Sequence, residues 1–366
     1  MSESIVGGKI VTIVGARPQF VKAAAVSRVL RERCEEVLIH TGQHYDPNMS
    51  QVFFDELDIP PPNVHLGIGS GNHGAQTGAM LAAIEAVLQE EKPDRVLVYG
   101  DTNSTLAGTV AAAKLHIPVA HVEAGLRSFN RRMPEEINRV LTDHVADLLF
   151  CPSQTAVEHL AREGITSGVH SVGDVMYEAL MYAVAVAKQK SDVAERFQLA
   201  PGEYVLATLH RAENTDDPVR LTAQIAALRE VSRESPVFFP VHPRTRAKLE
   251  AMGMDTDEDG LHLIDPLGYL DMVQMEAGAK VILTDSGGIQ KEAYWLHVPC
   301  VTLRDETEWV ETVQQGWNVL AGADREKIVK TALEPARPEE QPDAYQGAGS
   351  VSRIVKILEE TASIRE

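Results

Sequence analysis

The sequence lacks long apolar runs and is short of basic residues. No stretch approaches the ~18 consecutive apolar residues of a membrane-spanning helix, and the first residues have neither the basic start nor the apolar core of a secretory signal. Lysine and arginine total 34 against 53 aspartates and glutamates, so the net charge of −19 repels nucleic-acid phosphates and anionic membrane surfaces. We therefore expect a cytoplasmic protein whose partners include neither nucleic acid nor membrane.

Cysteine is also scarce. Cys34, Cys151 and Cys300 each adjoin an apolar run and form no CxxC pair, so they are expected to be buried free thiols. The thirteen histidines contain no HExxH motif and no Cys/His cluster. No Rossmann glycine fingerprint followed by an acidic ribose ligand is present. The sequence predicts neither a metal site nor a nicotinamide cofactor.

Short apolar runs alternate with helical segments, twice over. The runs are continuous, which is typical of strands buried on both faces of a parallel sheet. They lie at residues 9–14, 36–40, 94–99, 117–122 and 147–151, and again at 203–209, 236–241, 261–265, 280–284 and 299–303. The β-α-β-α order implies right-handed crossovers. We therefore predict an α/β fold with two Rossmann-like, doubly wound domains facing a cleft (GT-B-like, as argued below).

An alanine-rich helical stretch at residues 176–197 separates the two sets of strands. We predict an N-terminal Rossmann-like domain at residues 1–176 and a C-terminal one at 177–349. A helix within 350–366 is expected to pack back on the first domain. The alternative is a single large sheet. Because ligands of open α/β sheets bind beyond the carboxyl ends of the strands, the residues after each strand are the candidate site residues.

The segment GARPQFVK follows the first strand. Gly15 permits a tight turn, Arg17 projects from it, and Lys22 lies about one turn into the next helix. The arrangement resembles a phosphate cradle, although it matches neither the GxGxxG motif nor the P-loop motif. An ordinary helix start with surface charges is the alternative.

Acidic residues follow elements of the first half. Asp101 and Glu123 each lie at the carboxyl end of a strand, and Glu135, beside Glu136, opens a helix. Each alone could simply cap a helix or favour its dipole. Together, on one side of one sheet, three carboxylates can shift one another's pKa values and supply acid and base at a single carbon.

Histidine and arginine follow two strands of the second half. His210 and Arg211 come after residues 203–209, and His242 comes after 236–241. A lone histidine is more often structural than functional. At strand ends that face the same cleft, these side chains are candidates for binding the substrate.

The segment VILTDSGGIQKEA joins a strand to a helix through a glycine-rich turn. Ser286, Gly287 and Gly288 expose backbone N–H groups at a helix N-terminus, which suits a diphosphate. Glu292, about a turn later, can bind ribose hydroxyls. A plain turn is the alternative.

Seven motifs together closely resemble the non-hydrolysing UDP-N-acetylglucosamine 2-epimerase family, in its order and over almost the whole chain. They are GARPQFVK, GDTNST, HVEAGLRS, MPEEINR, HRAEN, PVHPRT and DSGGIQKEA. The resemblance implies a GT-B-like fold, a homodimer and a UDP-sugar substrate. It also implies elimination of UDP to a 2-acetamidoglucal and re-addition with the opposite configuration at C2, without a metal or redox cofactor.

The resemblance assigns roles to individual residues. It implies that Asp101, Glu123 and Glu135 are acid/base carboxylates and that His210 assists the departure of UDP. It places nucleotide binding at Arg17, Lys22, Ser286, Gly287, Gly288 and Glu292.

The chain also departs from the family pattern. Trp309 stands in TEWVE where many members have an arginine. This segment and TGQHYDPNMS, residues 41–50, look more like the subgroup that acts on UDP-2,3-diacetamido-2,3-dideoxyglucuronate. The carboxylate of Asp46 and the missing N–H of Pro47 also disfavour a second, activating UDP-sugar. A glycosyltransferase, a hydrolysing epimerase and a nucleotide-sugar sensor are the rival functions.

Overall fold

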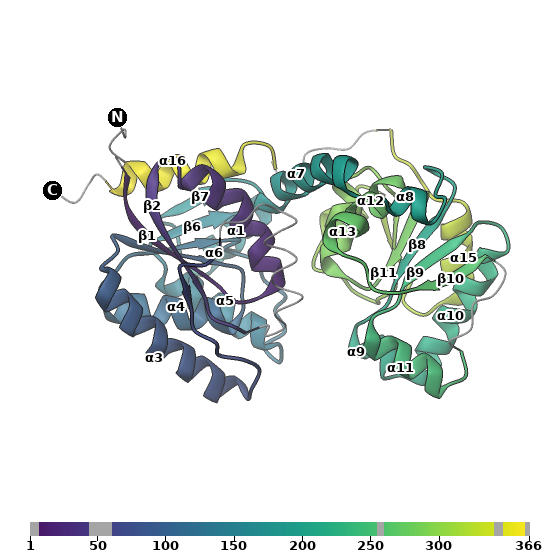
Figure 1. Ribbon diagram of the computed structural model, residues 1–366, viewed down its shortest axis with the longest axis horizontal. Coiled ribbons are helices and arrows are strands. Elements are labelled where there is room, and N and C mark those ends of the chain that lie inside the picture. The colour runs from purple at the N-terminus through teal and green to yellow at the C-terminus, as the bar shows by residue number, and fades with distance from the viewer. Residues whose placement is uncertain (1–6, 44–60, 255–259, 340–346, 363–366) are drawn as a thin grey trace. The chain divides into compact units, whose positions relative to one another are not determined.

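The computed structural model describes residues 7–43, 61–254, 260–339 and 347–362 (Figure 1). The chain divides into two compact units, unit 1 with residues 1–181 and 343–366, and unit 2 with residues 182–342. Each unit contains one fully parallel sheet. The predicted α/β fold of two Rossmann-like, doubly wound domains is confirmed.

Unit 1 is built on a seven-stranded sheet in the order β3-β2-β1-β4-β5-β6-β7. The strands are β1 (Gly7–Val14), β2 (Cys34–His40), β3 (Val64–His65), β4 (Arg95–Tyr99), β5 (Val119–Val122), β6 (Leu148–Cys151) and β7 (Val169–Ser171). Every residue of β4, β5 and β6 is buried. Apart from Arg95 and His121, these central strands are apolar, because helices cover both faces of the sheet.

The helices of unit 1 follow its strands. They are α1 (Arg17–Leu30), α3 (His73–Glu91), α4 (Asn103–Lys114), α5 (Pro134–Val145), α6 (Gln154–Arg162), α7 (Val175–Lys190) and α16 (Ser350–Ala362). Helix α3 buries Met80, Ile84 and Leu88 at four-residue spacing, in one core cluster with Val11 of β1 and Val98 of β4. The chain passes from unit 1 to unit 2 within α7.

Unit 2 is built on a six-stranded sheet in the order β10-β9-β8-β11-β12-β13. Its strands are β8 (Val205–Thr208), β9 (Val237–Pro240), β10 (Leu261–Ile264), β11 (Val281–Thr284), β12 (Cys300–Thr302) and β13 (Asn318–Leu320). Its helices are α8 (Val193–Arg196), α9 (Ala212–Thr215), α10 (Pro218–Ser232), α11 (Pro243–Ala251), α12 (Tyr269–Gly278), α13 (Gly287–Trp295), α14 (Val310–Gln314) and α15 (Arg325–Leu333). Two core clusters hold β8, β9 and β11 between these helices.

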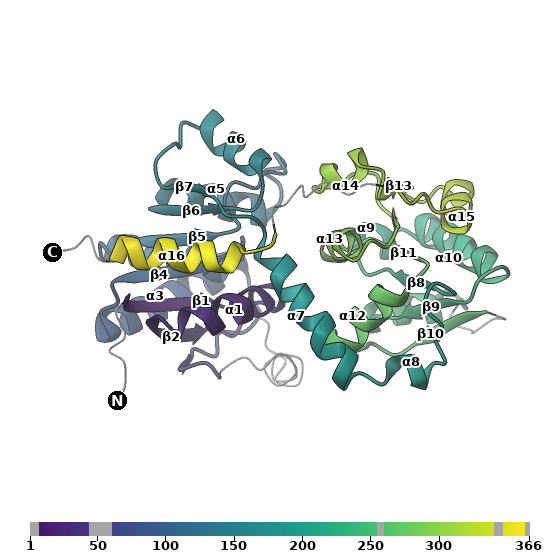
Figure 2. The same cartoon turned by 90° about the horizontal axis from the view of Figure 1, so that it is seen from above.

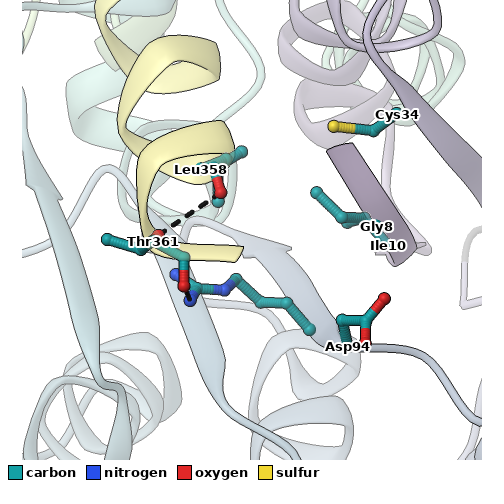
Figure 3. A pocket seen from close by; sticks show the side chains of 7 residues that line it. Gly8, Ile10, Cys34, Asp94, Leu358 and Thr361 are labelled. Carbon is teal, nitrogen blue, oxygen red and sulfur yellow. Dashed lines mark hydrogen bonds between the residues drawn. The ribbon is translucent and has the colours of Figure 1, made fainter. Parts of the chain in front are cut away.

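Helix α16 is far from α1 and β1 in sequence but lies beside them in unit 1 (Figure 2). Its C-terminal turn reaches the amino-terminal edge of the sheet, where Leu358 and Thr361 adjoin Gly8 and Asp94 around a small pocket (Figure 3). Arg95 donates to the Thr361 carbonyl at 3.5 Å. The helix is therefore attached at the edge of the sheet opposite to the loops that carry the predicted site.

Three strands escaped the sequence prediction. They are β3, β7 and β13, each of two or three residues at an edge of its sheet. An edge strand is covered on fewer sides, and these three include half-buried or exposed residues. A continuous apolar run is therefore not required of them.

The predicted state of the cysteines is confirmed. All three are buried free thiols within described strands. Burial raises the pKa of Cys34 to about 11 and those of Cys151 and Cys300 to about 12. No helix in the described part of the chain has the length and apolar character needed to cross a membrane.

Candidate active site

In each sheet the order in which successive strands are added reverses at one point. In unit 1 it lies between β1 and β4, and in unit 2 between β8 and β11. Loops after two such strands run to opposite sides and leave room for a ligand beyond the sheet edge. Each predicted site residue lies in a loop or helix that follows a strand at this carboxyl-terminal edge.

The loop after β1 is held by Gln19, which sequence reasoning missed. Its side-chain oxygen accepts from the backbone N–H groups of Gly15 and Ala16 at 2.8 and 3.0 Å. Its amide nitrogen donates to the Tyr99 carbonyl at 2.7 Å and so joins this loop to the end of β4. Because Gln19 occupies those two N–H groups, the predicted phosphate cradle depends on side chains. Arg17 is the first residue of α1.

Lys22 and Glu123 form a buried ion pair. Lys22 reaches out from α1, and its Nζ contacts Glu123 Oε2, with side chains only 8% and 11% exposed. Glu123 directly follows β5 and has a φ of +73°, a left-handed conformation that is rare and costly outside glycine. A Cβ atom at Gly100 would lie 3.2 Å from that same carboxylate oxygen, so the turn after β4 closely approaches the pair.

Asp101, in the turn after β4, is paired with Arg139 of α5. Arg139 Nε donates to Asp101 Oδ2 at 3.1 Å, and Nη2 makes a second contact to it. Desolvation raises the pKa of Asp101, the charge of Arg139 opposes that rise, and the charge of Glu123 adds to it. Asp101, Glu123, Lys22 and Arg139 therefore form one electrostatic cluster.

Glu135 and Glu136 open α5 in different environments. Glu135 is exposed, whereas Glu136 is 2% exposed and accepts hydrogen bonds from Ser128, Phe129 and Arg139 at 2.9 to 3.0 Å. Burial alone would raise the pKa of Glu136, but these hydrogen bonds and Arg139 lower it. Glu136 therefore shapes the loop between β5 and α5, and Glu135 is the one that is open to a ligand.

In unit 2, Asp285 connects the two loops at the switch point. It is fully buried at the end of β11 and accepts from the backbone N–H groups of His210 and Arg211 at 2.9 to 3.1 Å. Asn214 Nδ2 also donates to it at 3.1 Å. His210 Nδ1 lies 3.2 Å from Asp285 Oδ1, and its side chain is 43% exposed. The carboxylate thus orients His210 with its Nε2 edge directed away from Asp285.

The glycine-rich turn begins α13 as predicted. Ser286 is the N-cap and accepts from the Ile289 N–H at 3.5 Å. Gly287 and Gly288 occupy the first turn, where N–H groups have no acceptor within the helix. A Cβ atom at Gly287 would lie 3.2 Å from Glu308 and 3.3 Å from Trp309, so a side chain there would press on both.

Trp309 lies against this turn and stacks on a cation. Lys291 Nζ lies 3.9 Å from the centre of the Trp309 ring and 5.3 Å from that of Trp295. On the same helix, Glu292 is 7% exposed, and Tyr269 donates to it at 3.3 Å. The helix thus carries an oriented carboxylate about one turn after its N-terminal N–H groups.

Arg211 and His242 lie at helix starts. Arg211 is the N-cap of α9, and its guanidinium lies 3.9 Å from Glu308. His242 is the N-cap of α11, where its Nδ1 accepts from the Arg244 N–H at 3.2 Å. His242 therefore uses one ring nitrogen for capping and has only Nε2 to offer a ligand.

The segment TGQHYDPNMS is described only in its first three residues. Residues 44–50 of TGQHYDPNMS, including Asp46 and Pro47, lie outside the described residues. Gln43 is described and accepts from the Ser104 N–H and hydroxyl at 3.1 and 2.7 Å, so it caps α4. Within the described ranges, no three His, Cys, Asp or Glu side chains are grouped as a metal site requires.

The chain is similar to proteins of one kind. A family model described as UDP-N-acetylglucosamine 2-epimerase matches residues 28–359. A UDP-N-acetylglucosamine 2-epimerase homolog of Methanococcus maripaludis is 55% identical over 96% of this chain and 99% of its own length. The UDP-2,3-diacetamido-2,3-dideoxy-D-glucuronate 2-epimerase of Pseudomonas aeruginosa is 51% identical over the same shares.

Solved structures agree. The UDP-GlcNAc 2-epimerase of Methanocaldococcus jannaschii in complex with UDP-GlcNAc and UDP is 44% identical, with a TM-score of 0.85 over 96% of this chain and 99% of that one. The Neisseria meningitidis UDP-GlcNAc 2-epimerase bound to UDP-GlcNAc has a TM-score of 0.86 at 29% identity over the same shares. The predicted GT-B-like fold is confirmed.

Proposed function

The chain belongs to the UDP-N-acetylglucosamine 2-epimerase family, and we propose that it interconverts UDP-N-acetylglucosamine and UDP-N-acetylmannosamine without hydrolysing them. The observation that carries the proposal is the cluster of Asp101, Glu123 and Lys22 at the carboxyl ends of β1, β4 and β5. Epimerisation at C2 requires a proton to leave one face of the sugar and return to the other. Two carboxylates in one cluster suit that requirement.

The reaction proceeds by elimination and re-addition. A carboxylate takes the C2 proton, the C2–H electron pair forms a C1=C2 double bond, and the C1–O bond to UDP breaks. UDP then adds back to C1 while a second carboxylate delivers a proton to the other face of C2. Asp101 and Glu123 are the proposed pair, and Glu135 assists from the exposed start of α5.

Departure of UDP places negative charge on the diphosphate. The N–H groups of Gly287 and Gly288 at the start of α13 stabilise that charge, as does a proton on His210 Nε2. Asp285 supports this role because it accepts from Nδ1 and so orients the ring. Lys22 and Arg17 are the proposed diphosphate contacts of unit 1, Arg211 and His242 are further substrate contacts, and Glu292 binds the ribose.

Solvent exchange at C2 tests the function. We expect the protein in D₂O to incorporate deuterium at C2 of UDP-N-acetylglucosamine and to form the manno epimer, with the rate unchanged by EDTA or NAD. NMR of the C2 position follows both processes. Incubation without protein and with the Glu123→Gln variant supplies controls. Sugar transfer to an acceptor, or release of free sugar and UDP without C2 exchange, would contradict the proposal.

A second candidate substrate is UDP-2,3-diacetamido-2,3-dideoxyglucuronate, favoured by the 51% identity to the Pseudomonas aeruginosa enzyme. The same exchange experiment with both sugars compares their kcat/KM values. A higher kcat/KM for the diacetamido sugar would identify it as the preferred substrate, and the proposed 2-epimerisation would be unchanged.

Replacing Arg139 should change the pH dependence. Its charge and hydrogen bond lower the pKa of Asp101, so Arg139→Gln leaves only Lys22 to oppose desolvation and raises that pKa further. If Asp101 acts in its ionised form, the acid limb of the kcat/KM profile moves to higher pH. Arg139→Lys keeps a charge and should move it less. An acid limb that stays in place in Arg139→Gln would remove Asp101 from the base role.

We also propose a homodimer formed through α5. Ile137, Leu141 and Val145 follow one another at four-residue spacing and are 40 to 47% exposed, and nearby Phe129 is 69% exposed. Such a row on a surface helix supports an apolar interface. Sedimentation should give about twice the 40.0 kDa chain mass, and Leu141→Glu should give the single-chain mass. Val219→Glu, at an exposed apolar residue of α10, is the matched control. A wild-type monomer would exclude the interface.

A further inference from the structure

His121 is a fully buried histidine in the strand that directly precedes Glu123. It lies on β5 with 0% exposure. Its Nδ1 is 2.7 Å from Asp143 Oδ1 on α5, and its Nε2 is 2.7 Å from the carbonyl oxygen of Gly100. Both ring nitrogens therefore have short, direct partners within the protein.

Both partners are acceptors. The Gly100 carbonyl has no proton to donate. Asp143 already accepts at Oδ2 from the Gly125 N–H at 3.0 Å and from Arg127 at 2.6 Å. The Arg127 guanidinium and the Gly125 N–H both need an acceptor at Oδ2, so this carboxyl is ionised independently of His121. Two acceptors at 2.7 Å require a proton on each ring nitrogen of His121.

The surrounding charges favour that state. Arg127 also binds Glu163 through Nε and Nη2 at 2.7 and 2.8 Å. With His121 as an imidazolium, the group holds two cations and two anions. With a neutral His121, the single cation Arg127 would be shared by the buried Asp143 and by Glu163, whose side chain is 27% exposed, so a charged ring gives Asp143 a second buried counter-ion.

The ring joins the elements that carry the proposed catalytic carboxylates. The Gly100 carbonyl that it holds belongs to the turn that presents Asp101, and the N–H of Gly100 donates to Val122 at 3.0 Å. Its own strand continues two residues later into Glu123 with its strained φ of +73°. Asp143 belongs to α5, the helix that Glu135 opens.

We propose that His121 is an imidazolium that positions Asp101, Glu123 and Glu135 relative to one another. It touches no reacting atom in this role. Its effect on turnover rests on the proposed epimerase function, whereas its protonation does not.

Ring-nitrogen NMR tests the protonation directly. In protein labelled with ¹⁵N-histidine, we expect a proton on both ring nitrogens of His121. The resonances are assigned by their loss in whichever of His121→Asn and His121→Gln folds. If neither folds, neutron diffraction from wild-type crystals should show a hydrogen isotope on both nitrogens. An unprotonated Nδ1 or Nε2 overturns the proposal.

Turnover tests the positioning. The asparagine amide approximates Nδ1 and the glutamine amide approximates Nε2, so each variant keeps one bond and loses the charge. We expect kcat to fall by about 10²-fold in both, with KM little changed, because small misplacements of catalytic groups cost on that order. His170→Gln on β7, outside this network, should leave kcat unchanged. Wild-type kcat in both folded His121 variants would also overturn the proposal. Absence of C2 exchange in the wild type would instead remove the proposed function and leave the NMR result standing.

Discussion

Glu123→Gln is expected to lower kcat for C2 exchange by about 10³-fold, within the range of lost acid/base catalysis. Glutamine keeps the size of the side chain and can still accept from Lys22, but it can neither take nor deliver the C2 proton. Pre-steady-state exchange in D₂O separates this loss from slower product release. The fold is checked by circular dichroism, because the variant leaves the charge of Lys22 without its buried counter-ion.

The matched control is Glu158→Gln on α6. Glu158 also pairs with a cation, Arg162 at 3.6 Å, but its side chain is 53% exposed and distant in sequence from the candidate site. This variant should retain wild-type kcat. A Glu123→Gln enzyme that still exchanges C2 at the wild-type rate would reduce the Lys22–Glu123 pair to a structural contact.

Asp143→Ala is expected to destabilise unit 1 by about 3–5 kcal/mol, the cost of breaking a buried ion pair by removing one partner. Asp143 accepts from His121, Arg127 and Gly125, so its loss leaves two buried cations facing each other. Native-state hydrogen exchange measures the effect where it arises, as a lower free energy of opening for the amides of β4 and β5.

Two comparisons make that measurement specific. Glu158→Ala removes an exposed ion pair of the same unit and should change the opening free energies by less than about 1 kcal/mol. Asp143→Asn keeps the shape of the side chain and part of its hydrogen bonding. Its opening free energies should lie between those of Asp143→Ala and the wild type. Unchanged protection of β4 and β5 in Asp143→Ala would mean that the network contributes little to stability.

The strands and loops of the site were predictable because their signals are local. A continuous apolar run identifies a central strand, and the residue after it, such as Asp101 or Glu123, necessarily lies at the sheet edge. Contacts that depend on tertiary packing were not predictable. Asp285 was visible within DSGG, but its donors His210 and Arg211 lie more than 70 residues away in sequence.

Neighbouring residues of one type show the same limit. Glu135 and Glu136 both open α5, and helix capping or dipole arguments apply equally to each. Only the folded loop shows that Glu136 accepts from Ser128 and Phe129 and is buried, while Glu135 is exposed. The pairing of Arg139 with Asp101, 38 residues apart, likewise needs the packing of α5 against α4 and β5.

The return of α16 to unit 1 has a consequence for the growing polypeptide. Unit 2 is an insertion in unit 1 that begins within α7 and ends before α16. The ribosome must therefore synthesise all of unit 2 before α16 can pack on α1 and β1. At a translation rate of about 5–20 residues per second, α16 is synthesised on the order of ten seconds after α7. During that time unit 1 lacks this helix. Unit 2 is one continuous segment and can complete its sheet during that interval. Unit 1 can therefore be completed only after all of unit 2 has been synthesised.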